Sequence, residues 1–144
     1  MKGRIREAAE ARERAFYNRQ ASQEWLEALA PLGTDARKPF LETAPYLVVV
    51  FSEPYGLAPD GTKVKHYYLT QPVGIAAGLL VAAVHHAGLA SLTYTPGQMG
   101  FLNDLLDRPV NERPYLILAV GYPAPDAQVP LLCSKSLHEF ATFL

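Results

Sequence analysis

Three runs of mostly apolar, β-branched residues occur along the chain, and each has the length of a β-strand. They cover residues 45–51, 89–95 and 114–123, while polar residues are mixed into the segments between them. Runs that are apolar along their length are typical of strands buried on both faces of a sheet. We therefore predict three strands in one sheet, with helices covering both of its sides.

Helical patterns separate these strands. Residues 2–30 are rich in Ala, Glu, Arg and Leu, which predicts one long helix or two joined helices with a narrow apolar stripe. Further helices are predicted over residues 71–86 and 97–106, and the C-terminal tail is expected to form a short helix or an extended arm. Residues 52–63 are rich in Pro and Gly and predict a loop that contains a tight turn.

Composition narrows the classes of partner. The net charge of −1 argues against nucleic acid, because binding to phosphates requires a clustered cationic face. The apolar run over residues 73–84 is shorter than the roughly 20 residues that span a bilayer. The first residues are too charged for a secretory signal, so we expect a soluble cytoplasmic protein with no membrane partner. The adjacent His85 and His86 project in different directions from a helix, and no metal site is predicted.

The stretch Thr93-Tyr94-Thr95-Pro96 ends the second strand. Alternation along a strand directs Thr93 and Thr95 to one face and Tyr94 to the other. Pro96 then takes the chain out of the sheet. Hydroxyl groups at the end of a strand, just before a helix, can bind a planar heterocycle, although a Thr-Pro pair is more often only a turn.

Glu13 and Tyr17 are four residues apart and therefore project from one side of the first helix. A carboxylate beside a phenol suits a ligand that carries an amine. The same spacing also suits a solvated helix face, which is the more common explanation when spacing alone is considered.

Several motifs together resemble a known family. TAPYL, KHYY, LTYTP, DRPVNERP and VGYPAPDAQVP lie within a resemblance that extends over residues 7–137. They are similar to the FMN-dependent nitroreductase family and, more narrowly, to its iodotyrosine deiodinase-like subgroup. The resemblance implies an α+β fold, a nitroreductase-like three-layer sandwich in which helices flank a mixed sheet. It also implies one domain over residues 1–144, with a lid and helical region over 1–40 and a core and C-terminal arm over 45–144.

The resemblance assigns roles to particular residues. In the family, the residues that correspond to Thr93, Tyr94 and Thr95 contact the flavin of FMN, and the last of them hydrogen-bonds the flavin N5 atom. Thr95 is therefore the expected catalytic residue, because a hydroxyl group at N5 can tune electron transfer.

The subgroup also has a lid that binds the amino-acid portion of a halotyrosine. The corresponding residues here are Glu13, Tyr17 and Lys38. Glu13 is expected to bind the ammonium group and Lys38 the carboxylate, while Tyr17 hydrogen-bonds the carboxylate or packs over the ring.

Family members also have an N-terminal segment with an Arg-Arg-Ser-x-Arg motif for the FMN phosphate, and this sequence does not contain it. A family arginine near the C-terminus falls at Ser134, next to Lys135. We expect this chain to supply the part of the site that contacts the flavin ring.

The resemblance implies a flavin-dependent oxidoreductase that dehalogenates halotyrosines in the full-length protein, with NAD(P)H as the reductant and a homodimer as the assembly. Two alternatives remain open. One is a nitro- or quinone reductase with broad substrates, and the other is a non-catalytic dimerising remnant that does not bind FMN.

Overall fold

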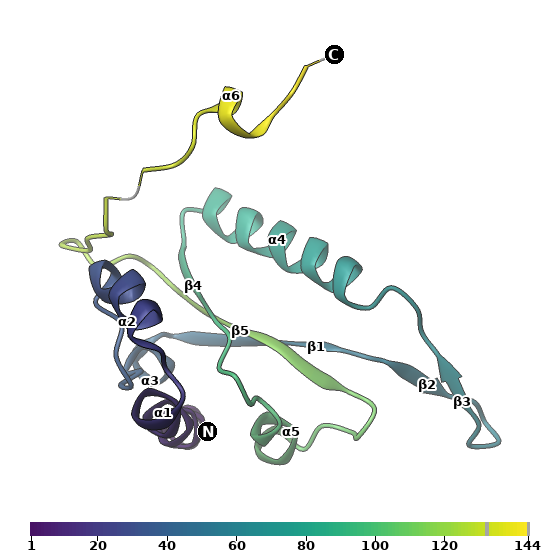
Figure 1. Cartoon of the computed structure of the whole chain (residues 1–144). Helices are drawn as coiled ribbons and strands as arrows, with labels where there is room; N and C mark the ends of the chain where they lie inside the picture. Colours follow the sequence, from purple (N-terminus) through teal and green to yellow (C-terminus); the bar gives the residue numbers. More distant parts are fainter. Residues whose placement is uncertain (132, 144) are drawn as a thin grey trace.

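The computed structural model describes residues 1–131 and 133–143. Its main sheet has three strands, β1 (Tyr46–Ser52), β4 (Ala90–Tyr94) and β5 (Arg113–Gly121), in the order β1-β5-β4 (Figure 1). All three strands that the apolar runs predicted are therefore confirmed. The domain predicted over residues 1–144 includes residues 132 and 144, which lie outside the described part, and its division into a lid region and a core stays a prediction.

The strand directions correct one detail of the expected fold. The resemblance implied a mixed sheet, but β1 and β4 are each antiparallel to β5. The strands β1 and β4 run in the same direction and never become neighbours, because β5 lies between them. The described part of the sheet is therefore antiparallel throughout, within a fold that is α+β as predicted.

Helices and a hairpin surround this sheet. The helices are α1 (Lys2–Arg19), α2 (Gln23–Leu29), the 3₁₀-helix η1 (Ala30–Leu32), α3 (Phe40–Thr43), α4 (Thr70–His86), α5 (Phe101–Leu106) and α6 (Leu137–Phe140). The hairpin consists of β2 (Tyr55–Leu57) and β3 (Lys63–Lys65). Figure 1 shows α4 along one face of the main sheet and α1 and α5 on the opposite side.

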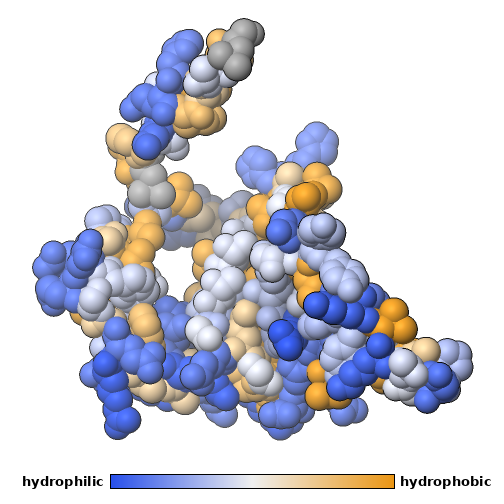
Figure 2. All heavy atoms as spheres, turned by 45° about the vertical axis from the view of Figure 1, so that its right-hand side comes forward, coloured by the Kyte–Doolittle hydropathy of each residue, from blue (hydrophilic) through white to orange (hydrophobic). Residues whose placement is uncertain are grey.

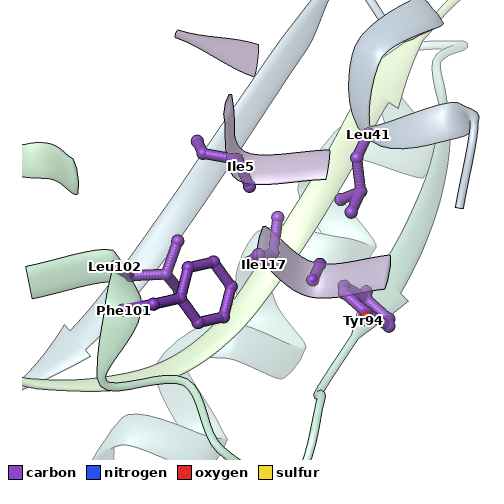
Figure 3. Close-up of a cluster of buried hydrophobic side chains, with 7 residues drawn as sticks. Ile5, Leu41, Tyr94, Phe101, Leu102 and Ile117 are labelled. Carbon is purple, nitrogen blue, oxygen red and sulfur yellow. The ribbon is translucent and has the colours of Figure 1, made fainter. Parts of the chain in front are cut away.

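Alternation along β5 builds a separate core on each face. Leu116, Leu118 and Val120 pack with Ala77 of α4. Ile117 points to the other face, where a second cluster is formed by residues of α1, α3, β4 and α5: Ile5, Ala9, Leu41, Tyr94, Phe101 and Leu102 (Figure 3). The sheet is therefore covered on both sides, as the apolar strands predicted.

The predicted N-terminal helical region is divided into two helices. The helix α1 ends at Arg19, and Ser22 caps α2 by accepting a hydrogen bond from the main-chain N–H of Trp25 at 3.2 Å. A left-handed Gly33, with φ of 61°, follows η1 and turns the chain towards residues 34–39. The alternative of two joined helices is thus the correct one. The turn at Gly33 brings the following loop back to α1.

The segment predicted as a loop over residues 52–63 contains the first strand of the hairpin. The turn itself is as predicted: the main-chain N–H of Thr62 donates to Asp60 at 2.9 Å, and Gly61 has a φ of 82°. The strands on either side are short and largely exposed, so they lack the apolar alternation that would indicate them.

After β5 the chain leaves the sheet as a C-terminal arm, residues 122–131 and 133–143, which projects away from the rest of the chain and carries α6 (Figure 1). Figure 2 shows apolar side chains, coloured orange, on the surface of this arm. Leu131, which is 98% exposed, and Phe140 are among the exposed apolar residues of the arm. Within residues 1–131 and 133–143, no helix has both the length and the apolar character needed to span a bilayer.

Candidate functional site

The end of β4 presents two different surfaces. Tyr94 is buried, whereas Thr93 and Thr95 on either side of it are exposed. This confirms the predicted alternation, and the strand ends at Tyr94, before Pro96. The two hydroxyl groups are therefore available to a ligand, while the phenol of Tyr94 points towards α1.

The phenol of Tyr94 lies in a cluster with Glu13 and Lys38. The Tyr94 hydroxyl donates a 2.9 Å hydrogen bond to Glu13 Oε1. Lys38 Nζ lies 3.6 Å from Glu13 Oε2, and the two charged side chains are only 7% and 14% exposed, respectively. Three residues that are far apart in the sequence thus form one polar cluster at the edge of the core.

Burial and the negative charge of Glu13 set the protonation of Tyr94. Burial is the larger cause, followed by the charge of Glu13 and the hydrogen bond to it, and all three raise the pKa of the phenol above its usual value. The Tyr94 hydroxyl therefore keeps its proton and acts as a donor to the carboxylate.

Residues 34–38 hold the lysine in place. Lys38 Nζ donates to Thr34 Oγ1 at 3.2 Å and also to the main-chain oxygen of Asp35. The main-chain N–H of Lys38 donates to Glu10 Oε1 at 2.8 Å. Glu10 comes from α1, one helical turn before Glu13, so the same helix positions both the lysine and its carboxylate partner.

Aromatic side chains form the next layer of the site. Trp25 of α2 packs edge-on against Phe16 and Tyr17 of α1, with ring centroids 5.0 and 5.5 Å apart. Lys38 Nζ lies 5.8 Å from the centroid of the Tyr17 ring and at the same distance from that of Tyr94. Tyr17 therefore lies in one cluster with Glu13 and Lys38, and the role of the three as a substrate lid stays a prediction.

Two adjoining cavities connect this cluster to the end of β4. One, of about 1010 Å³, is lined by Tyr17, Lys38 and Thr93 among others. The second, of about 420 Å³, includes Gln98, and both are lined by Glu13, Trp25 and Thr95. The arrangement places a carboxylate and an ammonium group beside aromatic rings and beside uncharged hydroxyl and amide groups.

The hydrogen bonds of Glu10 lead us to expect a pH-dependent contribution to the free energy of unfolding. The Arg6 guanidinium, at 2.8 Å, and then the N–H of Lys38 hold the pKa of the Glu10 carboxyl below its usual value. The folded chain therefore releases this proton more readily than the unfolded chain, so the stabilisation is complete above the ordinary pKa of about 4.3 and is lost as the pH falls through the lower folded value. We expect the unfolding free energies of the wild type and Glu10→Gln to differ at neutral pH and to converge below about pH 4.

Urea unfolding at several pH values measures this convergence. Glu7→Gln is the matched control, because Glu7 is exposed on the same helix and its replacement removes a charge from α1 while leaving the bonds of Glu10 to Arg6 and Lys38 in place. A difference between the wild type and Glu10→Gln that stays constant with pH would contradict a stabilising role for the ionised Glu10.

The structure thus brings Glu13, Tyr17 and Lys38 together beside Thr93 and Thr95. It turns the Tyr94 side chain away from the two threonines, a placement that strand alternation predicted, although its bond to Glu13 was not foreseen. Glu10 was also missed. The available signal was the spacing of four, three and four residues that puts Arg6, Glu10, Glu13 and Tyr17 on one face of α1.

The described residues hold no group of three or more His, Cys, Asp or Glu side chains arranged for a metal ion. The cavities next to β4 are lined by charged side chains such as Glu13 and Lys38 together with aromatic rings and the hydroxyls of Thr93 and Thr95.

No protein-family model matches the chain. Individual proteins match it over most of its length. It is 56% identical to an iodotyrosine deiodinase of Haliscomenobacter hydrossis over 94% of this chain and 61% of the relative, and 46% identical to one of Nematostella vectensis over 96% of this chain and 53% of the relative. The chain therefore spans between about half and three fifths of the length of these relatives.

Solved structures agree with the sequence matches. A crystal structure of oxidised iodotyrosine deiodinase bound to FMN and 3-iodo-L-tyrosine superposes with a TM-score of 0.78 at 34% identity, over 99% of this chain and 71% of that one. An FMN-containing oxidoreductase superposes with a TM-score of 0.53 at 20% identity, which supports the fold alone. With the shared fold and this level of identity, the chain belongs to the iodotyrosine deiodinase family of the nitroreductase fold.

Proposed function

We propose that this chain supplies the halotyrosine-binding and flavin-facing part of an FMN-dependent reductive dehalogenase. The observation that carries the proposal is the convergence of Glu13, Tyr17 and Lys38 on a cavity that Thr95 also lines. An α-amino acid carries one ammonium and one carboxylate, and the site offers one carboxylate and one ammonium within 4 Å of each other. Tyr17 and Trp25 supply the aromatic surface for a phenol ring.

The groups near Thr95 fit a flavin ring. The hydroxyls of Thr93 and Thr95 and the amide of Gln98 are uncharged hydrogen-bonding groups, which match the polar edge of an isoalloxazine. Thr93 and Thr95 would hold that edge, with the Thr95 hydroxyl as the proposed partner of N5. Because the Tyr94 side chain lies on the other face of β4, its proposed contact with the cofactor is restricted to its main chain.

Bound FMN would supply the two electrons with which the carbon–halogen bond is replaced by a carbon–hydrogen bond, with the proton coming from the reduced flavin or from solvent and the halogen leaving as halide. The chain's own residues bind and orient the substrate. Glu13 takes the ammonium group, Lys38 takes the carboxylate, and Tyr17 packs against or hydrogen-bonds the bound amino acid. Residues of α1, of α2 and of the segment 34–38 line the cavity in which the ring would lie. NAD(P)H as the reductant and a cytoplasmic location stay predictions.

A homodimer is the proposed assembly. Ile75 and Leu79 are each 66% exposed and lie one turn apart on the face of α4 that is turned away from the sheet. Leu131 and Phe140 of the C-terminal arm are exposed as well, and apolar surface of this kind favours self-association. Sedimentation equilibrium would show twice the chain mass, and a monomer at all concentrations would contradict this proposal.

Titration of the purified chain with FMN and 3-iodotyrosine tests the proposed function. We expect the flavin absorbance and fluorescence to change on binding, and 3-iodotyrosine to perturb the fluorescence of Trp25, the single tryptophan. With a chemical reductant, iodide release should follow. Rapid turnover of nitroaromatics with weak, non-saturable halotyrosine binding would favour the broad reductase, and a folded chain that leaves FMN free would favour the non-catalytic alternative.

A further inference from the structure

Glu13 and Lys38 each form a hydrogen bond with a second residue, the buried Tyr94 and the half-buried Glu10, respectively. The Tyr94 hydroxyl donates to Glu13 Oε1 at 2.9 Å, and Glu10 Oε1 accepts from the main-chain N–H of Lys38 at 2.8 Å. Tyr94 is 9% exposed and the Glu10 side chain 12% exposed. Neither group belongs to the set of residues expected to bind the amino acid.

The two charged groups that they hold are close but do not form a short hydrogen bond. Lys38 Nζ and Glu13 Oε2 are 3.6 Å apart, whereas charge-assisted hydrogen bonds are about 2.7–2.9 Å long. Lys38 Nζ has three donors, of which Thr34 and Asp35 occupy two. One donor of Lys38 and one oxygen of Glu13 therefore remain for a ligand in the cavity that both side chains line.

We infer that Tyr94 and Glu10 are positioning residues that fix this separation and thereby select an α-amino acid zwitterion. The inference rests on the proposed function, which places the ammonium at Glu13 and the carboxylate at Lys38. Covalent geometry sets the distance from the nitrogen to the nearer carboxylate oxygen of an α-amino acid at about 2.7 Å. We place the ligand ammonium about 2.8 Å from Glu13 and the ligand carboxylate about 2.8 Å from Lys38. The four charges then form a ring of alternating sign, whose last side is the 3.6 Å separation between Lys38 Nζ and Glu13 Oε2.

The role of the Tyr94 hydroxyl in positioning Glu13 can be tested separately from the packing of the Tyr94 ring. Its ring packs edge-on against Phe40 at 5.6 Å and belongs to the apolar cluster around Ile117 (Figure 3). Tyr94→Phe keeps that ring and removes only the donor to Glu13. Glu10→Ala removes the acceptor for Lys38, whereas Glu10→Gln keeps an oxygen in the same position.

Three ligands test the Glu13 end and the Lys38 end of the site independently. They are 3-iodotyrosine, 3-iodotyramine, which lacks the carboxylate, and 3-(3-iodo-4-hydroxyphenyl)propionate, which lacks the ammonium. Binding of each is measured by Trp25 fluorescence with FMN in excess. We expect Tyr94→Phe to weaken 3-iodotyrosine and 3-iodotyramine by about tenfold and to leave the propionate unchanged, because only the ammonium contacts Glu13.

Glu10→Ala should give the reverse pattern, weakening 3-iodotyrosine and the propionate by about tenfold and sparing 3-iodotyramine. Glu10→Gln should restore most of the affinity. Tyr46→Phe and Glu7→Ala are matched controls, since Tyr46 is 72% exposed on β1 and Glu7 is exposed on α1. Urea unfolding checks that every variant is folded at the assay temperature.

The possible outcomes distinguish this inference from the proposed function. Equal weakening of all three ligands by Tyr94→Phe, or no weakening by either variant, would overturn the positioning role while 3-iodotyrosine binding by the wild type upholds the proposed function. A folded wild-type chain that binds none of the three would overturn both.

Discussion

Replacing Lys38 with Met is expected to weaken 3-iodotyrosine binding by about 100-fold and to lower the free energy of unfolding by about 3 kcal/mol. The Lys38 side chain is 7% exposed and faces a Glu13 carboxylate that is 14% exposed. Met fills a similar volume but leaves that carboxylate buried without a cation. It also removes the donors to Thr34 and to the main chain of Asp35. Fluorescence titration measures the binding, and urea unfolding measures the stability.

Arg37 provides the matched control for this prediction. Its side chain is 80% exposed and forms an ion pair with Asp35 at 2.9 Å, so Arg37→Met should cost less than about 1 kcal/mol. The double variant Lys38→Met with Glu13→Gln should recover part of the stability lost in Lys38→Met, because no uncompensated charge remains, and it should not recover binding. Equal stability of Lys38→Met and Arg37→Met would show that the buried pair is not stabilising.

The strands were predictable from local pattern because both faces of the sheet are buried. The predicted segments 45–51 and 114–123 differ from β1 (Tyr46–Ser52) and β5 (Arg113–Gly121) by at most two residues at either end. The strand order was not predictable in this way, because apolar residues alone do not indicate which strand will supply the hydrogen-bonding partners. Five consecutive residues of β5 are buried because β5 is the central strand, but an apolar run in the sequence does not tell which strands will pair with it.

The candidate site was predictable only in part, because its residues are brought together by tertiary contacts. Spacing placed Glu13 and Tyr17 on one face of α1, but nothing local connects Lys38 to them. That connection depends on the left-handed Gly33 after η1, which returns the chain to α1, where the Lys38 N–H meets Glu10. Family resemblance supplied the lysine, while the roles of the residues behind the charged pair emerge only from the packed structure.

Ile117 and Leu118 provide the second large effect and separate stability from binding. Both are fully buried neighbours on β5, and they point to opposite faces of the sheet. Each substitution to Ala removes a large apolar side chain from a packed core, so each should lower the free energy of unfolding by about 3 kcal/mol, measured by urea unfolding.

Only Ile117→Ala should also weaken 3-iodotyrosine binding, by several-fold. Ile117 is the cross-strand partner of Tyr94 and packs in the same cluster, so a cavity there allows the tyrosine that contacts Glu13 to shift (Figure 3). Leu118 packs under α4, on the face away from the charged pair. Its cross-strand partner is Thr93, so its loss should act on the flavin-facing end of β4 and not on Glu13. Binding is compared at a temperature at which both variants remain folded. Equal loss of affinity in the two variants would mean that general softening of the sheet, rather than the position of Tyr94, sets the geometry of the site.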